Sequence, residues 1–379
     1  MKQAVIVAAK RTPFGKYGGV LKHLEPEDLL MTLYDHFKLQ HSDSLAGVDD
    51  IILGNVVGNG GNIARKSLLE AGLAHSIPGV TLDRQCGSGL EAIMHACRMI
   101  QAGAGEIYIA GGVESTSRAP WKIKRPQSVY DTKLPEFYER AAFAPEGQDP
   151  SMIQAAENVA RTYHVSREAQ DKYAHESHRK SLLAHQQGVM SQEIIPLTVK
   201  GAEVALDESI KPKLTLKKLS RLRSILPDGT VTVGNCCMKN DGAVMLLIME
   251  AKTAQRYGYT TGLRFVDGRT TGVDPQLLGI GPFPAVQQLL ERQQLTIEDI
   301  DAIELNEAFA SQVIASQQQL HITPQQLNKY GGAIAIGHPY GASGAALVTR
   351  LFYMTAARKS IATMGIGGGM GNAILFERW

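Results

Sequence analysis

Apolar residues along the chain occur in two patterns, short continuous runs and longer stretches with a period near 3.6 residues. The continuous runs at residues 50–57 and 105–112 predict buried strands, whereas the periodic stretches at 27–39 and 64–71 predict helices. Strands that alternate with helices predict an α/β fold with a mainly parallel sheet covered by helices. A third helix is predicted after residue 86, because these apolar positions share one face: Leu90, Ile93, Met94, Cys97 and Ile100.

The same order of elements recurs near the C-terminus. Residues 301–306 (DAIELN) correspond to residues 50–55 (DIILGN), and the apolar run at 360–365 corresponds to 106–111. Cys86 and His338 follow the two asparagines of these motifs at nearly the same spacing. A chance likeness between two generic α/β halves is the alternative, but the matched order and spacing favour an internal duplication, with Cys86 and His338 at equivalent turns.

The middle of the chain breaks this pattern. Several prolines interrupt residues 120–150, and helices are predicted from Gln154 and from Ser166, the latter as an N-cap. Residues 209–227 contain no acidic residue, so this segment is either a solvated surface or a pocket for a phosphorylated ligand. The basic residues of this segment are Lys211, Lys213, Lys217, Lys218, Arg221 and Arg223.

Length and composition narrow the class of protein. With 379 residues, 44% hydrophobic and 20% charged, the chain predicts a globular protein of two or three units with an ample core. We expect an N-terminal half at 1–116, completed by 240–260, a loop domain at 117–239 and a C-terminal half at 261–379. The net charge of +2 argues against non-specific nucleic-acid binding.

Targeting signals and disulfides are not expected. No apolar run approaches the ~20 residues of a membrane span, and the N-terminus reads as a strand rather than a signal peptide. Four cysteines do not make a disulfide framework in a chain of this length, so we expect a cytoplasmic protein.

Cys86 is the first candidate for chemistry. It lies between a predicted strand and a predicted helix, beside Gly87 and Gly89, which permit a tight turn. The unpaired N–H groups and the dipole of a helix N-terminus favour the thiolate. An isolated cysteine is more often a buried structural residue, but this context favours an activated nucleophile.

His338 and Asn306 are candidates for the same site. His338 lies among glycines that permit close approach to a ligand, and a Cys/His pair is a standard source of thiolate at neutral pH. Asn306 ends a predicted strand at the same edge of the sheet, where its amide could orient a water or stabilise an oxyanion.

Two other patterns resemble a cofactor site and a metal site, but the surrounding sequence favours other interpretations. Residues 365–371 (GIGGGMG) resemble a dinucleotide-binding loop, but the eight residues that follow read as a strand and leave no room for the required helix. A strand–turn–strand with bare N–H groups, suited to an oxyanion hole, fits better. His175 and His178 share a helix face without a third ligand, so we expect surface histidines and no metal site.

Several motifs, in the right order over essentially the whole chain, resemble those of the thiolases, the acyl-CoA:acetyl-CoA C-acyltransferases. The motifs are residues 8–15 (AAKRTPFG), 83–90 (DRQCGSGL), 111–115 (GGVES), 240–242 (NDG), 306–310 (NEAFA), 331–344 (GGAIAIGHPYGASG) and 367–371 (GGGMG).

The resemblance implies a five-layer αβαβα fold of two duplicated halves, a loop domain that binds coenzyme A (CoA), and a homodimer or homotetramer. It implies that Cys86, activated by His338, takes an acyl group from a CoA thioester, so that CoA is a substrate and no resident cofactor is needed. Asn306, through a water, and His338 would form one oxyanion hole, and the N–H groups of Cys86 and Gly367 the other. The same resemblance puts these residues beside CoA: Ser151, Met152, Lys211, Cys237, Leu278 and Phe309.

The sequence departs from the thiolase pattern around this pocket. Gly365 occupies the position of a second cysteine, the acid–base residue for carbon–carbon bond chemistry in thiolases. The usual His-Met-Gly is Ser151-Met152-Ile153, and the usual Ala-Ser-Gly is Cys236-Cys237-Met238. Lys211 stands where an arginine is common, which keeps the charge but stacks less well on an adenine.

Three functions therefore remain open. The first is a thiolase that condenses or cleaves with Cys237 or a water in place of the missing thiol. The second is another enzyme with an acylated cysteine, which would be a hydrolase, a transacylase or a decarboxylating condensing enzyme. The third is a CoA-binding protein or partner subunit without activity. Loss of an acid–base residue typically costs ~10²–10⁴-fold in rate, whereas acylation of Cys86 does not need that residue.

Overall fold

The computed structural model describes residues 2–126, 128–130, 132–138 and 140–379. Its main feature is one sheet with two similar parts, joined where β1 and β11 pair at Val5–Arg264 and Ile6–Leu263. The N-terminal part has the order β4-β3-β5-β10-β1, with β2 (Gly15–Lys16) on β10. Its strands are β1 (Ala4–Arg11), β3 (Asp50–Gly54), β4 (Gly79–Leu82), β5 (Ile107–Ser115) and β10 (Asn240–Glu250).

The C-terminal part repeats this order as β12-β13-β14-β11, and a bridge between Ile303 and Leu327 stands where β4 pairs with β3 in the first part. The repeated order agrees with the duplication expected from the sequence. The strands are β11 (Leu263–Gly272), β12 (Ala302–Leu305), β13 (Lys359–Ile366) and β14 (Met370–Arg378).

The expectation of a mainly parallel sheet was wrong, because the sheet is mixed. Pairs β3–β4, β3–β5 and β12–β13 are parallel, but β10 and β14 run antiparallel to both of their main-path neighbours. Only three residues, 367–369, separate β13 from β14, and so short a turn joins antiparallel strands only.

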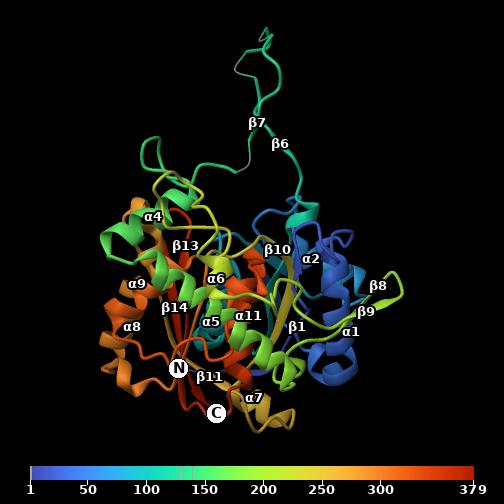
Figure 1. Ribbon diagram of the computed structural model, residues 1–379. Helices are drawn as coiled ribbons and strands as arrows, with labels where there is room; N and C mark the ends of the chain where they lie inside the picture. The colour runs from blue at the N-terminus through green and yellow to red at the C-terminus, as the bar shows by residue number, and fades with distance from the viewer. Residues whose placement is uncertain (1, 127, 131, 139) are drawn as a thin grey trace.

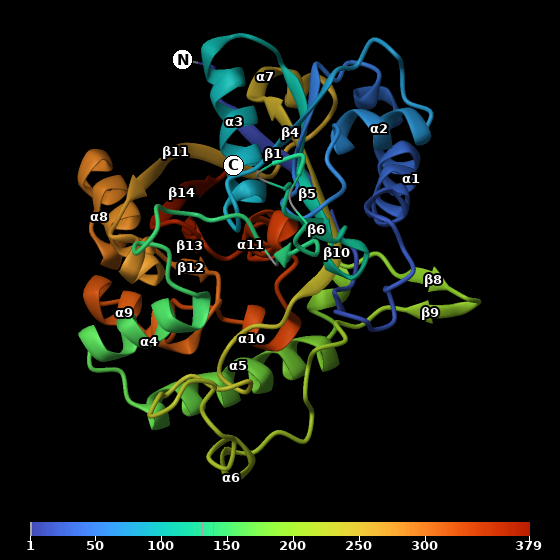
Figure 2. The same ribbon diagram turned by 90° about the horizontal axis from the view of Figure 1, so that it is seen from above.

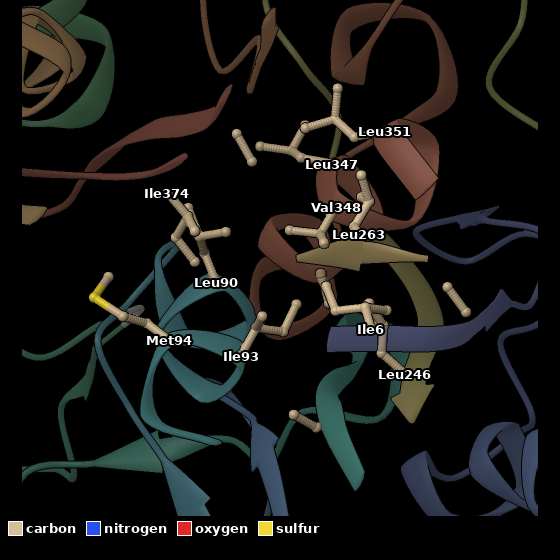
Figure 3. Packing of buried hydrophobic residues seen from close by; sticks show 14 of the residues in the cluster. Ile6, Leu90, Ile93, Met94, Leu246, Leu263, Leu347, Val348, Leu351 and Ile374 are labelled. Carbon is tan, nitrogen blue, oxygen red and sulfur yellow. The ribbon is translucent and has the colours of Figure 1, made fainter. Parts of the chain in front are cut away.

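Helices form three layers around the two parts of the sheet (Figures 1 and 2). The central layer is α3 (Ser88–Ala102) and α11 (Tyr340–Tyr353), the helices that follow Cys86 and His338. Their apolar faces meet between the strands, where Leu90, Ile93 and Met94 approach Leu347, Val348 and Leu351 (Figure 3). The outer layers are α1 (Pro26–Leu45), α2 (Ile63–Glu70) and α7 (Ala251–Arg256) on one side, and α8 (Pro282–Gln293) and α9 (Ala310–Leu320) on the other.

Buried salt bridges tie the middle of the chain to this core. Arg11 of β1 makes a bidentate contact with Asp207 at 2.7 and 2.9 Å, and Glu193 contacts both Arg11 and Arg350 of α11. Removing one partner of such a buried pair leaves an uncompensated charge, so these contacts hold the middle region in place.

The middle region combines short strands with helices. Ser166 caps α5 by accepting a hydrogen bond from the Ala169 N–H at 3.2 Å, as predicted. Among the described residues, no helix is both long and apolar enough to cross a membrane. The elements are β6 (Lys122–Ile123), β7 (Phe137–Tyr138), α4 (Met152–Thr162), α5 (Arg167–Gln186), β8 (Leu197–Val199), β9 (Ala202–Val204) and α6 (Leu216–Leu219); α10 (Ala333–Ile336) lies just before His338.

Candidate active site

The predicted catalytic residues gather where three strands end. Cys86 follows β4, Asn306 follows β12 and Gly367 follows β13, and each of these strands has a parallel neighbour. The carboxyl ends of parallel strands share one edge of a sheet, which is where α/β proteins usually bind ligands. His338 reaches the same place from the second half, because helices α3 and α11 begin side by side. A Cβ added to Gly89 would lie 2.5 Å from the Gly341 carbonyl oxygen, so glycine is needed for this approach.

The turn that carries Cys86 differs from the expectation in one respect. Gly87 has an ordinary φ of −77°, and it is Gln85 that adopts the left-handed conformation, with φ +48°. Asp83 accepts a hydrogen bond from the Gln85 N–H at 2.8 Å, and the Ser88 hydroxyl donates to the Gln85 carbonyl at 2.6 Å. These contacts hold a non-glycine residue in a conformation that costs about 1–3 kcal/mol, which is typical of functional turns.

Burial decides the protonation state of Cys86. It raises the pKa of the thiol to about 11, although the N–H groups of Gly367 and of Cys86 itself donate to the sulfur and lower it. The N–H groups favour the thiolate, as expected for a helix N-terminus, but desolvation outweighs them. Cys86 rests as a thiol and needs a base when it reacts.

Alkylation of Cys86 by iodoacetamide is expected to accelerate about tenfold for each pH unit from pH 7 to 9. The raised pKa leaves a thiolate fraction of roughly 10⁻⁴ at pH 7, which grows as pH rises toward that pKa. The rate can be followed by mass spectrometry of the peptide that contains Cys86. In guanidinium-unfolded protein the same peptide should level off near pH 9, and a rate already maximal at pH 7 in the folded protein would contradict the assignment.

His338 is held as a neutral base. Burial lowers the pKa of this imidazole to about 4. The Ser343 hydroxyl donates to the Pro339 carbonyl at 2.9 Å, so it accepts the proton on His338 Nδ1, which lies 2.6 Å away. This pairing assigns the proton to Nδ1 and makes Nε2 the nitrogen whose lone pair can accept a proton.

Asn306 faces that nitrogen. Its Nδ2 lies 3.4 Å from His338 Nε2, and the backbone of Asn306 donates to the Thr363 carbonyl of β13 at 3.1 Å. The structure therefore brings Asn306 and His338 together, and it brings Cys86 and Gly367 together through the hydrogen bond to the sulfur.

Three residues that support the site were not assigned roles from the sequence. Ser343 orients His338, Asn240 Oδ1 accepts from the His338 N–H at 3.2 Å, and Glu114 accepts from the Gly341 N–H at 3.0 Å. Burial raises the pKa of Glu114 to about 7, and N–H groups of Val56 and Val57 also donate to it. All three lie within motifs that the sequence analysis identified. Position in a motif alone does not distinguish a residue that supports the site from a residue that reacts.

In space, the segment that contains Cys237 runs between the Asn306 loop and His338. The Cys237 N–H donates to the Ala308 carbonyl at 3.0 Å, and the Met238 carbonyl accepts from the His338 N–H at 3.1 Å. Burial raises the pKa of the Cys237 thiol well above its usual range, and the nearby Cys86 raises it further. Cys237 is thus a protonated thiol within electrostatic range of Cys86.

Gly365 leaves room for a side chain. A Cβ added there would lie 3.4 Å from the Leu278 carbonyl oxygen, 3.5 Å from that of Gly279 and 3.6 Å from Pro282, all ordinary contacts. The residue lies in a regular strand pair opposite Gly371 and is partly exposed. Neither the backbone nor the packing requires glycine at this position.

The residues expected to contact CoA occupy varied positions. Leu278 is buried beside Gly365, Phe309 is half-buried and Lys211 is exposed. The exposed Ser151 caps α4 by accepting from the Gln154 N–H at 3.1 Å, and Met152 begins that helix. The six basic residues of the 209–227 segment are all exposed, which fits either reading of that segment.

The prediction of a surface histidine at 178 was wrong. His178 is 2% exposed, and its Nδ1 accepts a hydrogen bond from the Lys211 N–H at 3.2 Å. Burial lowers the pKa of His178 to about 4, so this ring is neutral and anchors the start of the basic segment. The helix face that carries His178 is poor in apolar residues, so the sequence pattern did not predict its burial. The contact joins two elements that are far apart in the sequence.

Comparison with known proteins gives one consistent result. Residues 4–252 match the family model described as "Thiolase, N-terminal domain" and residues 260–378 match "Thiolase, C-terminal domain". A Staphylococcus epidermidis protein named "Putative acetyl-CoA C-acetyltransferase VraB" is 66% identical over 379 residues, which are 100% of this chain and 99% of that protein.

Solved structures agree. The crystal structure of the Bacillus anthracis acetyl-CoA acetyltransferase has a TM-score of 0.95 and 34% sequence identity, covering 100% of this chain and 99% of that one. The human mitochondrial 3-ketoacyl-CoA thiolase in complex with CoA has a TM-score of 0.93 and 33% identity, covering 100% of this chain and 98% of that one.

Proposed function

We propose that this chain, which belongs to the thiolase family, transfers acyl groups between CoA thioesters through an acyl-Cys86 intermediate. The observation that carries the proposal is the placement of Asn306 Nδ2 at 3.4 Å from His338 Nε2, together with a Gly367 N–H that is close enough to the Cys86 sulfur to lower the pKa of its thiol. A thioester formed on that sulfur would hold its carbonyl oxygen near the N–H groups of Cys86 and Gly367, the arrangement of an oxyanion hole.

The first half-reaction needs only groups that are present. The neutral His338 accepts the Cys86 proton at Nε2, the sulfur attacks the thioester carbonyl carbon, and the bond from that carbon to the CoA sulfur breaks. The proton passes from His338 to the departing CoA thiolate. Ser343 stabilises the imidazolium that forms in between, because it accepts a hydrogen bond from Nδ1–H.

The second half-reaction depends on a further acid–base group. Condensation removes a proton from the methyl carbon of acetyl-CoA, and the reverse cleavage returns it. Gly365 has no side chain to do this. We propose Cys237 for the role, because it is a thiol within electrostatic range of Cys86, beside the Asn306 loop.

Acyl transfer that needs no proton removal from carbon is the second candidate function, and the bare position at Gly365 favours it. Such an enzyme would hydrolyse the acyl-cysteine, pass the acyl group to another thiol, or condense after a decarboxylation that replaces proton removal. The homodimer or homotetramer implied by the family is compatible with either candidate.

Intact-protein mass spectrometry after acetyl-CoA, combined with an assay of acetoacetyl-CoA plus CoA, separates these functions. We expect one acetyl group on Cys86 and conversion of acetoacetyl-CoA and CoA to two acetyl-CoA. An adduct with turnover of acyl-CoA or malonyl-CoA but no thiolysis would support the second candidate. The absence of an adduct would contradict both and leave a CoA-binding protein.

A further inference from the structure

A loop from the middle region lies against the glycine turn of the active site. The ring of Phe143 packs on Gly367, since a Cβ added to Gly367 would lie 2.8 and 2.9 Å from two ring carbons. The Phe143 carbonyl oxygen would lie 3.1 Å from a Cβ on Gly368. Residues 140–151, which precede α4, pass above β13 and β14 (Figure 2). Only glycine at position 367 leaves room for this ring.

A clamp holds Phe143 in this position. Arg140 donates two hydrogen bonds to the Asp149 carboxylate, both at 2.9 Å, and its guanidinium lies 4.1 Å from the centre of the Phe143 ring. Arg140 lowers the pKa of the Asp149 carboxyl, and the nearby Phe143 N–H lowers it further. Farther along the loop, the Gly147 carbonyl accepts from Gln276 at 3.1 Å. Bidentate and cation–π contacts of this kind fix a side chain more firmly than apolar packing alone.

The ring therefore lies against Gly367, the residue whose N–H faces Cys86. Gly367 presents its N–H to the Cys86 sulfur, and Phe143 covers the Cα of the same residue. We infer that Phe143, clamped by Arg140 and Asp149, closes the acyl pocket over Cys86, limits the acyl group to short chains and shields the acyl-enzyme from water. This inference rests on the proposed function, because it concerns the fate of an acyl group on Cys86.

The shielded reaction is simple hydrolysis. A water oxygen would bond to the acyl carbon, and the bond from that carbon to the Cys86 sulfur would break. One proton of the water would stay on the carboxylic acid that leaves, and the other would restore the Cys86 thiol. A site that excludes water suppresses this loss and leaves transfer to a second acceptor as the main route.

The test compares wild type with Phe143→Ala and Asp149→Asn after acylation by acetyl-, hexanoyl- and octanoyl-CoA. We expect acetyl-Cys86 in both variants to hydrolyse about tenfold faster or more, and the longer adducts to form much faster than in the wild type. Asp149→Asn keeps the ring and the shape of the clamp but removes its charge, so it remains informative if Phe143→Ala folds poorly.

Phe137→Ala is the matched control, because Phe137 is 59% exposed on β7 and makes an edge-to-face contact with Trp121. This variant should behave as the wild type does. If the wild type forms acetyl-Cys86 but hydrolysis and chain-length profile are unchanged in both loop variants, the role of Phe143 is refuted while the proposed function stands. If the wild type forms no adduct, the proposed function fails and this inference fails with it.

Discussion

Replacing Cys86 with alanine is expected to abolish acyl-enzyme formation and to lower acyl transfer by roughly 10⁴- to 10⁶-fold, as removal of a catalytic nucleophile does in other enzymes. Cys86 is the sulfur that accepts the Gly367 N–H, so no other thiol has the same stabilisation for an oxyanion. The measurement is the intact mass after acetyl-CoA together with the rate of acetoacetyl-CoA cleavage.

Cys97→Ala is the matched control for this variant. Cys97 is fully buried in α3, one of the helices that follow the active-site turns, and burial raises the pKa of its thiol far above the usual range. We expect this variant to lose about 1 kcal/mol of stability and to keep normal acylation. An adduct that persists in Cys86→Ala, for example on Cys237, would show that the nucleophile has been misassigned.

Introducing cysteine as Gly365→Cys is expected to raise the rate of acetoacetyl-CoA synthesis and cleavage by about 10²–10⁴-fold, the usual contribution of a positioned acid–base group. A Cβ fits at this position with ordinary contacts, so the side chain should be accommodated without moving Leu278 or Gly279. Steady-state rates in both directions measure the effect, and acylation of Cys86 should change little because it does not use this group.

Gly365→Ser is the control, since it fills nearly the same space with a hydroxyl that is a poor base. It should not reproduce the gain. Cys237→Ser then separates two explanations of any activity of the wild type. Loss of condensation with retained acylation would assign the acid–base role to Cys237, whereas equal rates in Gly365→Cys and wild type would mean that position 365 is not where the proton is transferred.

Local features of the sequence were sufficient for the fold class, the repeated order of elements along the chain and the choice of candidate site residues. The turn at 367–369, the N-cap at Ser166 and the helix after Cys86 follow from glycine placement, capping chemistry and apolar period, all of which act within a few residues. The family motifs added the role of the Gly367 N–H, whereas Asn306 was already a candidate from its place at the end of a strand.

The relative direction of the strands was harder to predict from the sequence. The parallel pairs arise from strand–helix–strand units, which the sequence displays, but β10 returns to the sheet after the whole middle region and its antiparallel place depends on distant partners. The burial of His178 escaped prediction for the same reason, since its partner is the backbone of Lys211.

By itself, then, the sequence determined which residues are candidates for the reaction and on which turns they lie, because turn and helix signals are local. Only the tertiary structure decided the chemical state of those residues. Burial from both halves keeps Cys86 a thiol and His338 a neutral base, against the thiolate that the helix N-terminus alone would favour. The tertiary structure also decided that there is room for a side chain at Gly365 and that Phe143 covers Gly367. Both features depend on contacts between segments that are far apart in the chain.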